Sequence, residues 1–232
     1  MKNLDKIVDK IEKNMDEKEK LREKSLRSCR SIVQLCRKAI QNMYNNSISS
    51  AEKNIEKAMK GLNDLLENIK EHHVDLFYSG FMENMFQEIT EACCLLQIIK
   101  NEDLPDPDEL KVTYSAYLLG LGDLVGELRR FALDCIINKD VEEANKYLNR
   151  MEKIYGILIK FDYPSGFIPL KRKQDVARGL IEKTRGEITV AVCEERIGEK
   201  IYEFGNLLDK TEKNKKTKNR KKELDLNIDK VW

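Results

Sequence analysis

The chain has 232 residues and a nearly balanced charge, with 42 lysines and arginines against 41 acidic residues. A formal net charge of +1 excludes a global basic signature of nucleic-acid binding, although balance overall can hide local asymmetry. No run approaches the roughly 18 continuous apolar residues of a membrane span, and the charged N-terminus lacks the apolar stretch of a signal peptide. We therefore expect a cytoplasmic protein with no membrane partner, whose six cysteines are reduced thiols in apolar helical stretches.

The apolar spacing along the chain predicts helices almost throughout. Only 4 prolines and 11 glycines are present and 36% of the residues are charged, which is typical of an all-α protein. Apolar residues three or four apart recur in six segments, and asparagine, glycine or proline punctuates the breaks between them. In chain order, the expected helices span residues 3–46, 50–72, 76–101, 113–138, 140–160 and 171–208.

Two flanking regions differ in composition from the rest of the chain. Residues 1–20 are a charged amphipathic extension of the first helix, and residues 210–232 are a tail rich in lysine and asparagine. The stretch 210–222 has no apolar face, so we expect it to be disordered. The sequence therefore predicts one helical domain over residues 1–209, followed by a disordered basic tail.

Two acidic pairs lie within otherwise apolar helical segments. Glu88 and Glu91 are three apart in QEITEACCLL, and Asp123 and Glu127 are four apart in YLLGLGDLVGELRRFA. Each spacing puts two carboxylates on one face of a helix. Four carboxylates in a helix–helix interior need compensating positive charge, and oxygen ligands suit Mg²⁺ or Mn²⁺. The pattern predicts a divalent-metal site for phosphate chemistry.

The alternative, from the residues alone, is a set of ion pairs between these acids and neighbouring arginines or lysines. Arg129 and Arg130 directly follow the second acidic pair, where an arginine either binds a scissile phosphate or pairs with an acidic neighbour. Arg30, Arg37 and Lys38 form a basic string on the first helix. That string is either a nucleic-acid-binding surface or a solvated helix face.

A resemblance to the translin superfamily lies first in the segment YSAYLLGLGDLVGELRRFALDCIINKD. This segment resembles the signature helix of the family and is most like that of translin-associated factor X and its archaeal relatives. Three further segments resemble family elements: REKSLRSCRSIVQLCRKAIQNMY, FMENMFQEITEACCLL and LKRKQDVARGLIEKTRGEITVAV. The resemblance covers about residues 20–200. The chain departs from the family pattern in its N-terminal extension and in its basic tail.

The resemblance implies an all-α bundle of about six to seven helices that assembles into a closed homo-oligomeric shell, often an octamer. It also implies a Mg²⁺-dependent (or Mn²⁺-dependent) endoribonuclease acting on single-stranded RNA, and it leaves binding of single-stranded DNA open. The matching acids are Glu88, Glu91, Asp123 and Glu127, which would be both metal ligands and catalytic residues. In the mechanism that we expect, a carboxylate not fully occupied by the metal would accept the proton of the attacking water, and Glu127 is the candidate.

Two other functions fit parts of the pattern. A non-catalytic protein of the same family would bind single-stranded RNA or DNA without cutting it. An all-α nucleotide pyrophosphohydrolase also places two acidic pairs on adjacent helices around Mg²⁺. Such an enzyme usually has a shorter chain and a second pair spaced by three, whereas the second pair here is spaced by four within GELRR.

Overall fold

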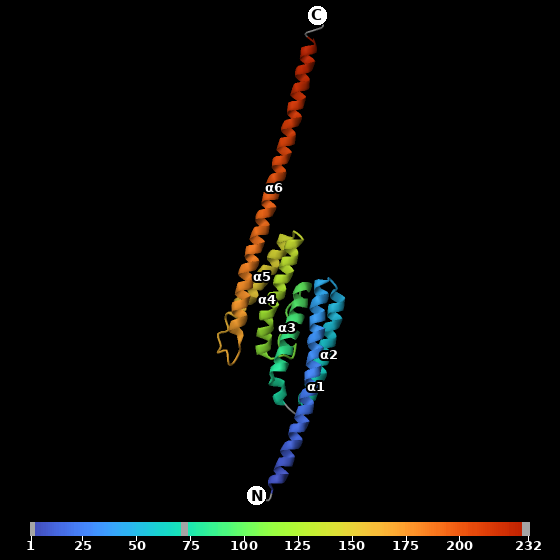
Figure 1. Cartoon of the computed structure of the whole chain (residues 1–232), viewed down its shortest axis with the longest axis vertical. Helices are drawn as coiled ribbons and strands as arrows, with labels where there is room; N and C mark the ends of the chain where they lie inside the picture. Colours follow the sequence, from blue (N-terminus) through green and yellow to red (C-terminus); the bar gives the residue numbers. More distant parts are fainter. Residues whose placement is uncertain (1–2, 71–73, 229–232) are drawn as a thin grey trace. The chain divides into compact units, whose positions relative to one another are not determined.

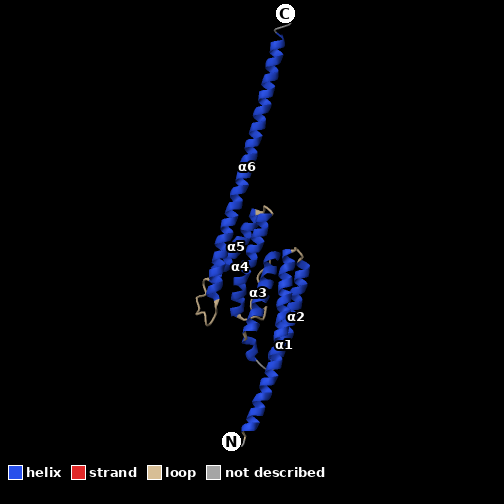
Figure 2. Cartoon of the chain, in the orientation of Figure 1, coloured by secondary structure: helices blue, strands red, loops and turns tan. Residues whose placement is uncertain are grey.

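In the computed structural model, residues 3–70 and 74–228 are described, and they form six α-helices, one short 3₁₀ helix and no strand. Figure 2 shows this helical content, which confirms the predicted all-α class. The elements in chain order are α1 (Leu4–Tyr44), α2 (Ile48–Lys70), η1 (Val74–Tyr78), α3 (Gly80–Lys100), α4 (Tyr114–Ile137), α5 (Val141–Leu158) and α6 (Leu170–Ile228).

The chain divides into two compact units, Met1–Thr184 and Arg185–Trp232. In the first unit α1 packs against α2 and α3, α3 packs against α4, and α4 packs against α5 (Figure 1). The early turns of α6 join this bundle through the Gln174 side chain, which donates hydrogen bonds to the carbonyls of Leu158 and Phe161. Both acidic pairs lie in the first unit, because α3 and α4 belong to it.

The C-terminal end of the chain differs from the expectation. The sequence predicts one domain to residue 209 and disorder from 210 to 232, whereas α6 continues as a helix to Ile228. Lysine, glutamate and leucine have high intrinsic helix propensity, and a polar segment can be helical without a buried face. Residues 229–232 of the predicted tail lie outside the described part of the chain.

Local capping explains where the central helices begin and end. Thr113 caps α4 by accepting a hydrogen bond from the Ala116 amide at 3.2 Å, and Asp140 caps α5 by accepting from the Glu143 amide at 3.0 Å. α3 ends at Asn101, whose backbone is left-handed with φ 57°. The proline-containing segment that follows cannot continue the helix.

α3 and α4 pack unusually closely at Gly120. A Cβ atom at this position would lie 2.7 Å from the Thr90 Cβ and 2.8 Å from the Gln87 carbonyl oxygen. Only glycine therefore permits this approach of the two backbones. Because Gly120 precedes Asp123 by one helical turn and Thr90 adjoins Glu91, the contact lies beside both acidic pairs.

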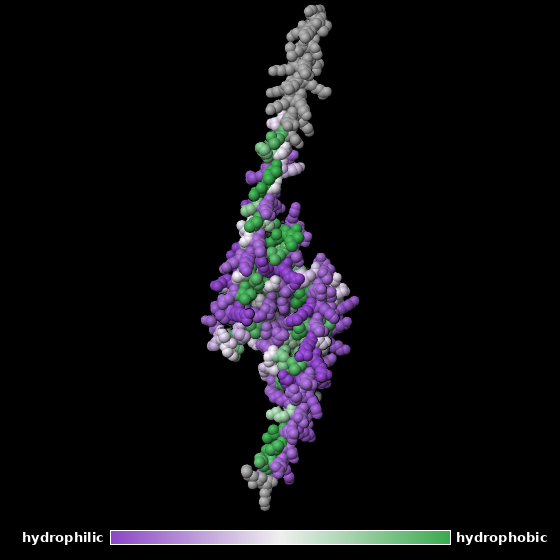
Figure 3. All heavy atoms as spheres, in the orientation of Figure 1, coloured by the Kyte–Doolittle hydropathy of each residue, from purple (hydrophilic) through white to green (hydrophobic). Residues whose placement is uncertain are grey.

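α1 carries a single apolar stripe that is buried in one half and exposed in the other. In the C-terminal half the stripe is buried at Cys29, Ile32, Cys36, Ala39 and Met43. In the N-terminal half, five apolar side chains are 45–59% exposed: Leu4, Ile7, Val8, Ile11 and Met15. Figure 3 shows a hydrophobic patch toward this end of the chain. Exposed apolar patches of this kind mark contact surfaces.

The structure also bears on the membrane and cysteine expectations. None of the described helices is long and apolar enough to traverse a lipid bilayer. The six cysteines are free thiols, and Cys29, Cys36, Cys93 and Cys94 are buried as expected. Cys193 is exposed on α6, which the apolar pattern around it did not predict.

Candidate metal centre and phosphate-binding pocket

The four predicted carboxylates lie near one another at the contact between α3 and α4. Burial is the largest cause that raises the pKa of Glu91, from 4.5 to about 8. The negative charges of the other three carboxylates act in the same direction, whereas Lys173 opposes them. Charges shift a pKa in this way only at short range, so the fold brings both acidic pairs to one place.

Three of the four carboxylates have a positive or hydroxyl partner. The Arg37 guanidinium of α1 donates to Glu88 from Nη2 at 2.6 Å and from Nε at 3.3 Å, as a two-pronged ion pair. The Lys173 ammonium of α6 donates to Asp123. The Tyr44 hydroxyl of α1 donates to Glu127. Each of these carboxylates therefore accepts a hydrogen bond from a helix other than its own.

Tyr44 is held in place by aromatic and cationic neighbours. Its ring stacks on Phe131 with centroids 4.6 Å apart, and the Arg130 guanidinium carbon lies 4.2 Å from the ring centroid. Burial, and after it the hydrogen bond to Glu127, raises the pKa of Tyr44, so the hydroxyl remains a donor. The orientation of Glu127 therefore depends on a fixed phenol.

A pocket of about 400 Å³ opens on this cluster. It combines acidic and basic side chains, a composition suited to a cation and a phosphate together. Its lining consists of Arg37, Ile40, Gln41, Tyr44, Glu88, Glu91, Glu127 and Arg130. Asp123 is not part of this lining. It lies beside the pocket and pairs with Lys173.

The side chains, as placed, do not form a finished metal-binding set. Within residues 3–70 and 74–228, no three histidine, cysteine or acidic side chains come together closely enough to hold an ion. The donor chemistry fits a hard divalent cation, since all four groups are carboxylates. Holding one would require Glu88 and Asp123 to turn from their basic partners.

The stability of the metal-free protein should depend on pH through Glu91. Its folded pKa of about 8 lies above the ordinary value of 4.5, so the folded state keeps a proton that the unfolded chain loses. The free energy of unfolding should therefore fall as pH rises from 4.5 toward 8, by about 2 kcal/mol after allowance for partial solvent exposure. Urea denaturation in EDTA at several pH values measures this, and Glu91→Gln should flatten the profile.

The structure separates the predicted basic residues into groups. Arg37 and Arg130 line the pocket, whereas Arg30 and Lys38 are exposed on α1 and do not. Arg129 donates to the Thr184 hydroxyl at 2.7 Å, which joins α4 to α6. Its position favours the structural alternative for Arg129, and Arg130 remains the candidate for phosphate contact.

Sequence reasoning missed Tyr44 and Lys173. Tyr44 follows Arg37 by seven residues, so both lie on one face of α1, and this spacing was a usable signal. Lys173 had no comparable signal, because its role depends on how the first turn of α6 approaches α4. A pattern along one helix cannot predict that approach.

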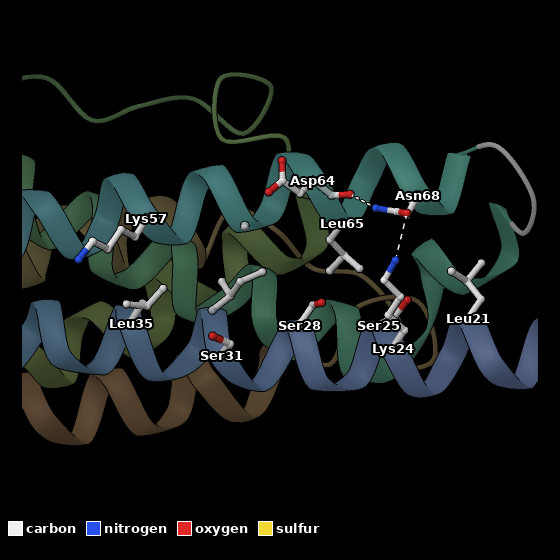
Figure 4. Close-up of a pocket in the computed structure, with 12 residues that line it drawn as sticks. Leu21, Lys24, Ser25, Ser28, Ser31, Leu35, Lys57, Asp64, Leu65 and Asn68 are labelled. Atoms are coloured by element: carbon white, nitrogen blue, oxygen red, sulfur yellow. Dashed lines mark hydrogen bonds between the residues drawn. The ribbon is translucent and has the colours of Figure 1, made fainter.

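A second pocket, of about 380 Å³, lies between α1 and α2 (Figure 4). Ser25, Ser28 and Ser31 line it from α1, and Lys57 and Asp64 line it from α2. Asp64 is the single carboxylate among the described residues in this lining. The pocket therefore lacks the acidic cluster and is not the predicted site.

The fold and the pocket define an all-helical bundle protein with a carboxylate cluster flanked by arginines. Residues 4–185 match the sequence profile of the translin family, and the chain belongs to that family. It is 32% identical over 179 residues to the uncharacterized protein MJ0175 of Methanocaldococcus jannaschii, covering 75% of this chain and 78% of that protein.

Solved structures agree with this assignment. The structure described as the crystal structure of AfC3PO is 32% identical, with a TM-score of 0.74 over 81% of this chain and 97% of that one. AfC3PO in complex with duplex RNA is 30% identical, with a TM-score of 0.70 over the same shares. Apo-NeC3PO is 25% identical, with a TM-score of 0.70 over 82% of this chain and 98% of that one.

Proposed function

We propose that the protein is a Mg²⁺-dependent endoribonuclease that cuts single-stranded RNA at the α3–α4 carboxylate cluster. The observation that carries the proposal is the meeting of three carboxylates with two arginines at one pocket, with the fourth carboxylate, Asp123, beside it. RNA as the ligand is supported by the similarity to AfC3PO, which has been solved with duplex RNA. Mn²⁺ is the alternative ion, because it accepts the same oxygen ligands.

The roles of the individual residues follow from their positions. Glu88, Glu91, Asp123 and Glu127 would hold the ion, which when bound supplies activation of water and neutralisation of phosphate charge. Arg130 and Arg37 would bind the phosphodiester, because guanidinium groups pair with phosphate oxygens bidentately. Glu127, held by the Tyr44 hydroxyl, would accept the proton of the attacking water.

A non-catalytic RNA-binding protein is the second candidate function. The observation that favours it is the pairing of Glu88 with Arg37 and of Asp123 with Lys173. Such ion pairs can have a purely structural role and need no metal. In that case the arginines at the pocket would bind RNA, and the acids would only position them.

An RNA-cleavage assay separates these functions. The full chain is incubated with labelled single-stranded RNA, duplex RNA, single-stranded DNA and nucleoside triphosphates, each with Mg²⁺ or with EDTA. We expect internal cuts in single-stranded RNA that require Mg²⁺. Binding without cutting would support the second candidate, and release of pyrophosphate from triphosphates would support a pyrophosphohydrolase.

We also propose that copies of the chain assemble into a closed homo-oligomeric shell, by resemblance an octamer. The exposed N-terminal stripe of α1 supplies an apolar contact surface. In the second unit, α6 exposes a further apolar series: Val190, Ile197, Ile201, Phe204 and Leu208. Surfaces of this kind are typical of contacts between subunits.

Substitutions on the α1 stripe should therefore disrupt assembly. The double variant Val8→Glu and Ile11→Glu places charges on the stripe, and we expect light scattering to report a smaller particle with an unchanged helical spectrum. The matched control, Lys13→Gln with Lys20→Gln, changes net charge equally on another face of the same segment. If the stripe variant and the control variant both formed particles of the wild-type mass, the stripe would take no part in assembly.

A further inference from the structure

Lys173 reaches Asp123 because α6 approaches α4 unusually closely. A Cβ atom at Gly122 would lie 2.9 Å from the Lys173 Cβ and 3.3 Å from its Cγ, so the lysine stem crosses α4 where a side chain is absent. The stem is packed there and the ammonium group rests on the Asp123 carboxylate. Gly122 and Asp123 are adjacent, so one site on α4 both admits the lysine and receives its charge.

Lys173 compensates the negative charge of Asp123, as Arg37 compensates that of Glu88. Its ammonium group donates to the Asp123 carboxylate, one helical turn before Glu127 on α4. The Asp123 and Lys173 side chains are 35% and 29% exposed, so the pair is partly shielded from water. An ammonium group and a divalent cation repel each other strongly at short range and would compete for the same carboxylate.

Lysine is well suited to reversible pairing. Its ammonium is a compact point charge on a flexible stem, whereas the planar guanidinium of Arg37 holds Glu88 by two hydrogen bonds. Rotation about the outer bonds of the side chain, beyond the packed Cβ and Cγ atoms, can therefore free Asp123 without moving α6.

We propose that Lys173 is an internal counter-ion that occupies Asp123 in the metal-free protein and competes with the divalent cation for it. This inference rests on the proposed function, which supplies the cation. Lys173 is then a positioning residue that sets the Mg²⁺ concentration at which the site fills. Without a counter-ion, the metal-free cluster would carry uncompensated repulsion.

The test measures metal binding rather than cleavage. Lys173→Met keeps the apolar stem and removes the charge. The matched control is Lys171→Met, because Lys171 is an exposed lysine on the same turn of α6 and pairs with Asp175. Calorimetry on the full chain gives the Mg²⁺ dissociation constant, and thermal denaturation gives the melting temperature with EDTA and with saturating Mg²⁺. Lys173→Gln provides a second neutral variant if the methionine variant folds poorly.

We expect Lys173→Met to bind Mg²⁺ about tenfold more tightly than the wild type. Its melting temperature should fall in EDTA and recover in saturating Mg²⁺, whereas Lys171→Met should match the wild type in both. Unchanged or weaker Mg²⁺ binding by both neutral Lys173 variants would overturn the inference and leave the proposed function standing. A wild type that binds no Mg²⁺ would overturn the proposed function, and the inference with it.

Discussion

Replacing Glu91 with glutamine is expected to abolish most RNA cleavage while making the metal-free protein more stable. Cleavage should fall by about 10²- to 10⁴-fold, because an amide cannot supply the negative charge that holds a divalent ion. At pH 8 in EDTA, the free energy of unfolding should rise by about 1–3 kcal/mol, because the variant no longer ionises a partly buried carboxylate among like charges.

Opposite effects on activity and stability are diagnostic of this site. Asp123→Asn and Glu127→Gln should lose cleavage similarly, but each leaves Lys173 or Tyr44 with a weaker partner, so we expect little gain in stability. Glu102→Gln is the matched control, since Glu102 is an exposed acid outside the pocket. Cleavage assays and urea denaturation of the same preparations measure both effects. Normal RNA cleavage by Glu91→Gln would contradict the assignment of Glu91 to the metal site.

Gly120→Ala is expected to have the largest effect on stability of any single methyl addition in the bundle. The new Cβ would overlap Thr90 and the Gln87 carbonyl, so α3 and α4 must separate, at a cost of about 3 kcal/mol. The separation would also move Glu91 away from Asp123, and Mg²⁺ binding should weaken even where the variant remains folded.

Gly179→Ala is the control for the backbone effect of the same substitution. Gly179 lies inside α6 with no other atom within 4 Å of an added Cβ. Alanine there should raise the free energy of unfolding by about 0.5–1 kcal/mol, because it favours the helix. Urea denaturation compares the two variants, and equal stability would mean that the close α3–α4 contact is not required.

Much of the fold was predictable because it rests on local patterns. Periodic apolar residues predicted each helix of the first unit to within a few residues, and the asparagine and proline breaks predicted the ends. The course of α6 beyond residue 208 was not predictable from amphipathicity, because the sequence there has no apolar stripe and its lysines, glutamates and leucines favour a helix by intrinsic propensity. The division of the chain at Thr184 also depends on packing, which local spacing does not report.

The candidate site was predictable in its acids but not in its partners. Spacing on one helix placed Glu88 beside Glu91, and Asp123 beside Glu127. That the two pairs meet depends on Gly120, whose importance is visible only from the backbone of α3. The sequence could not decide between a metal and ion pairs, and the structure contains the ion pairs Arg37–Glu88 and Lys173–Asp123.

The most direct test of the carboxylate cluster as a metal centre is a crystal structure of the full chain grown with Mn²⁺. The anomalous signal of manganese locates the ion independently of its ligands. We expect a peak roughly 2.0–2.6 Å from carboxylate oxygens contributed by both α3 and α4, with Lys173 released from Asp123. A structure with saturating Mn²⁺ in which the Asp123–Lys173 and Glu88–Arg37 pairs persist, and no peak lies between α3 and α4, would contradict this expectation.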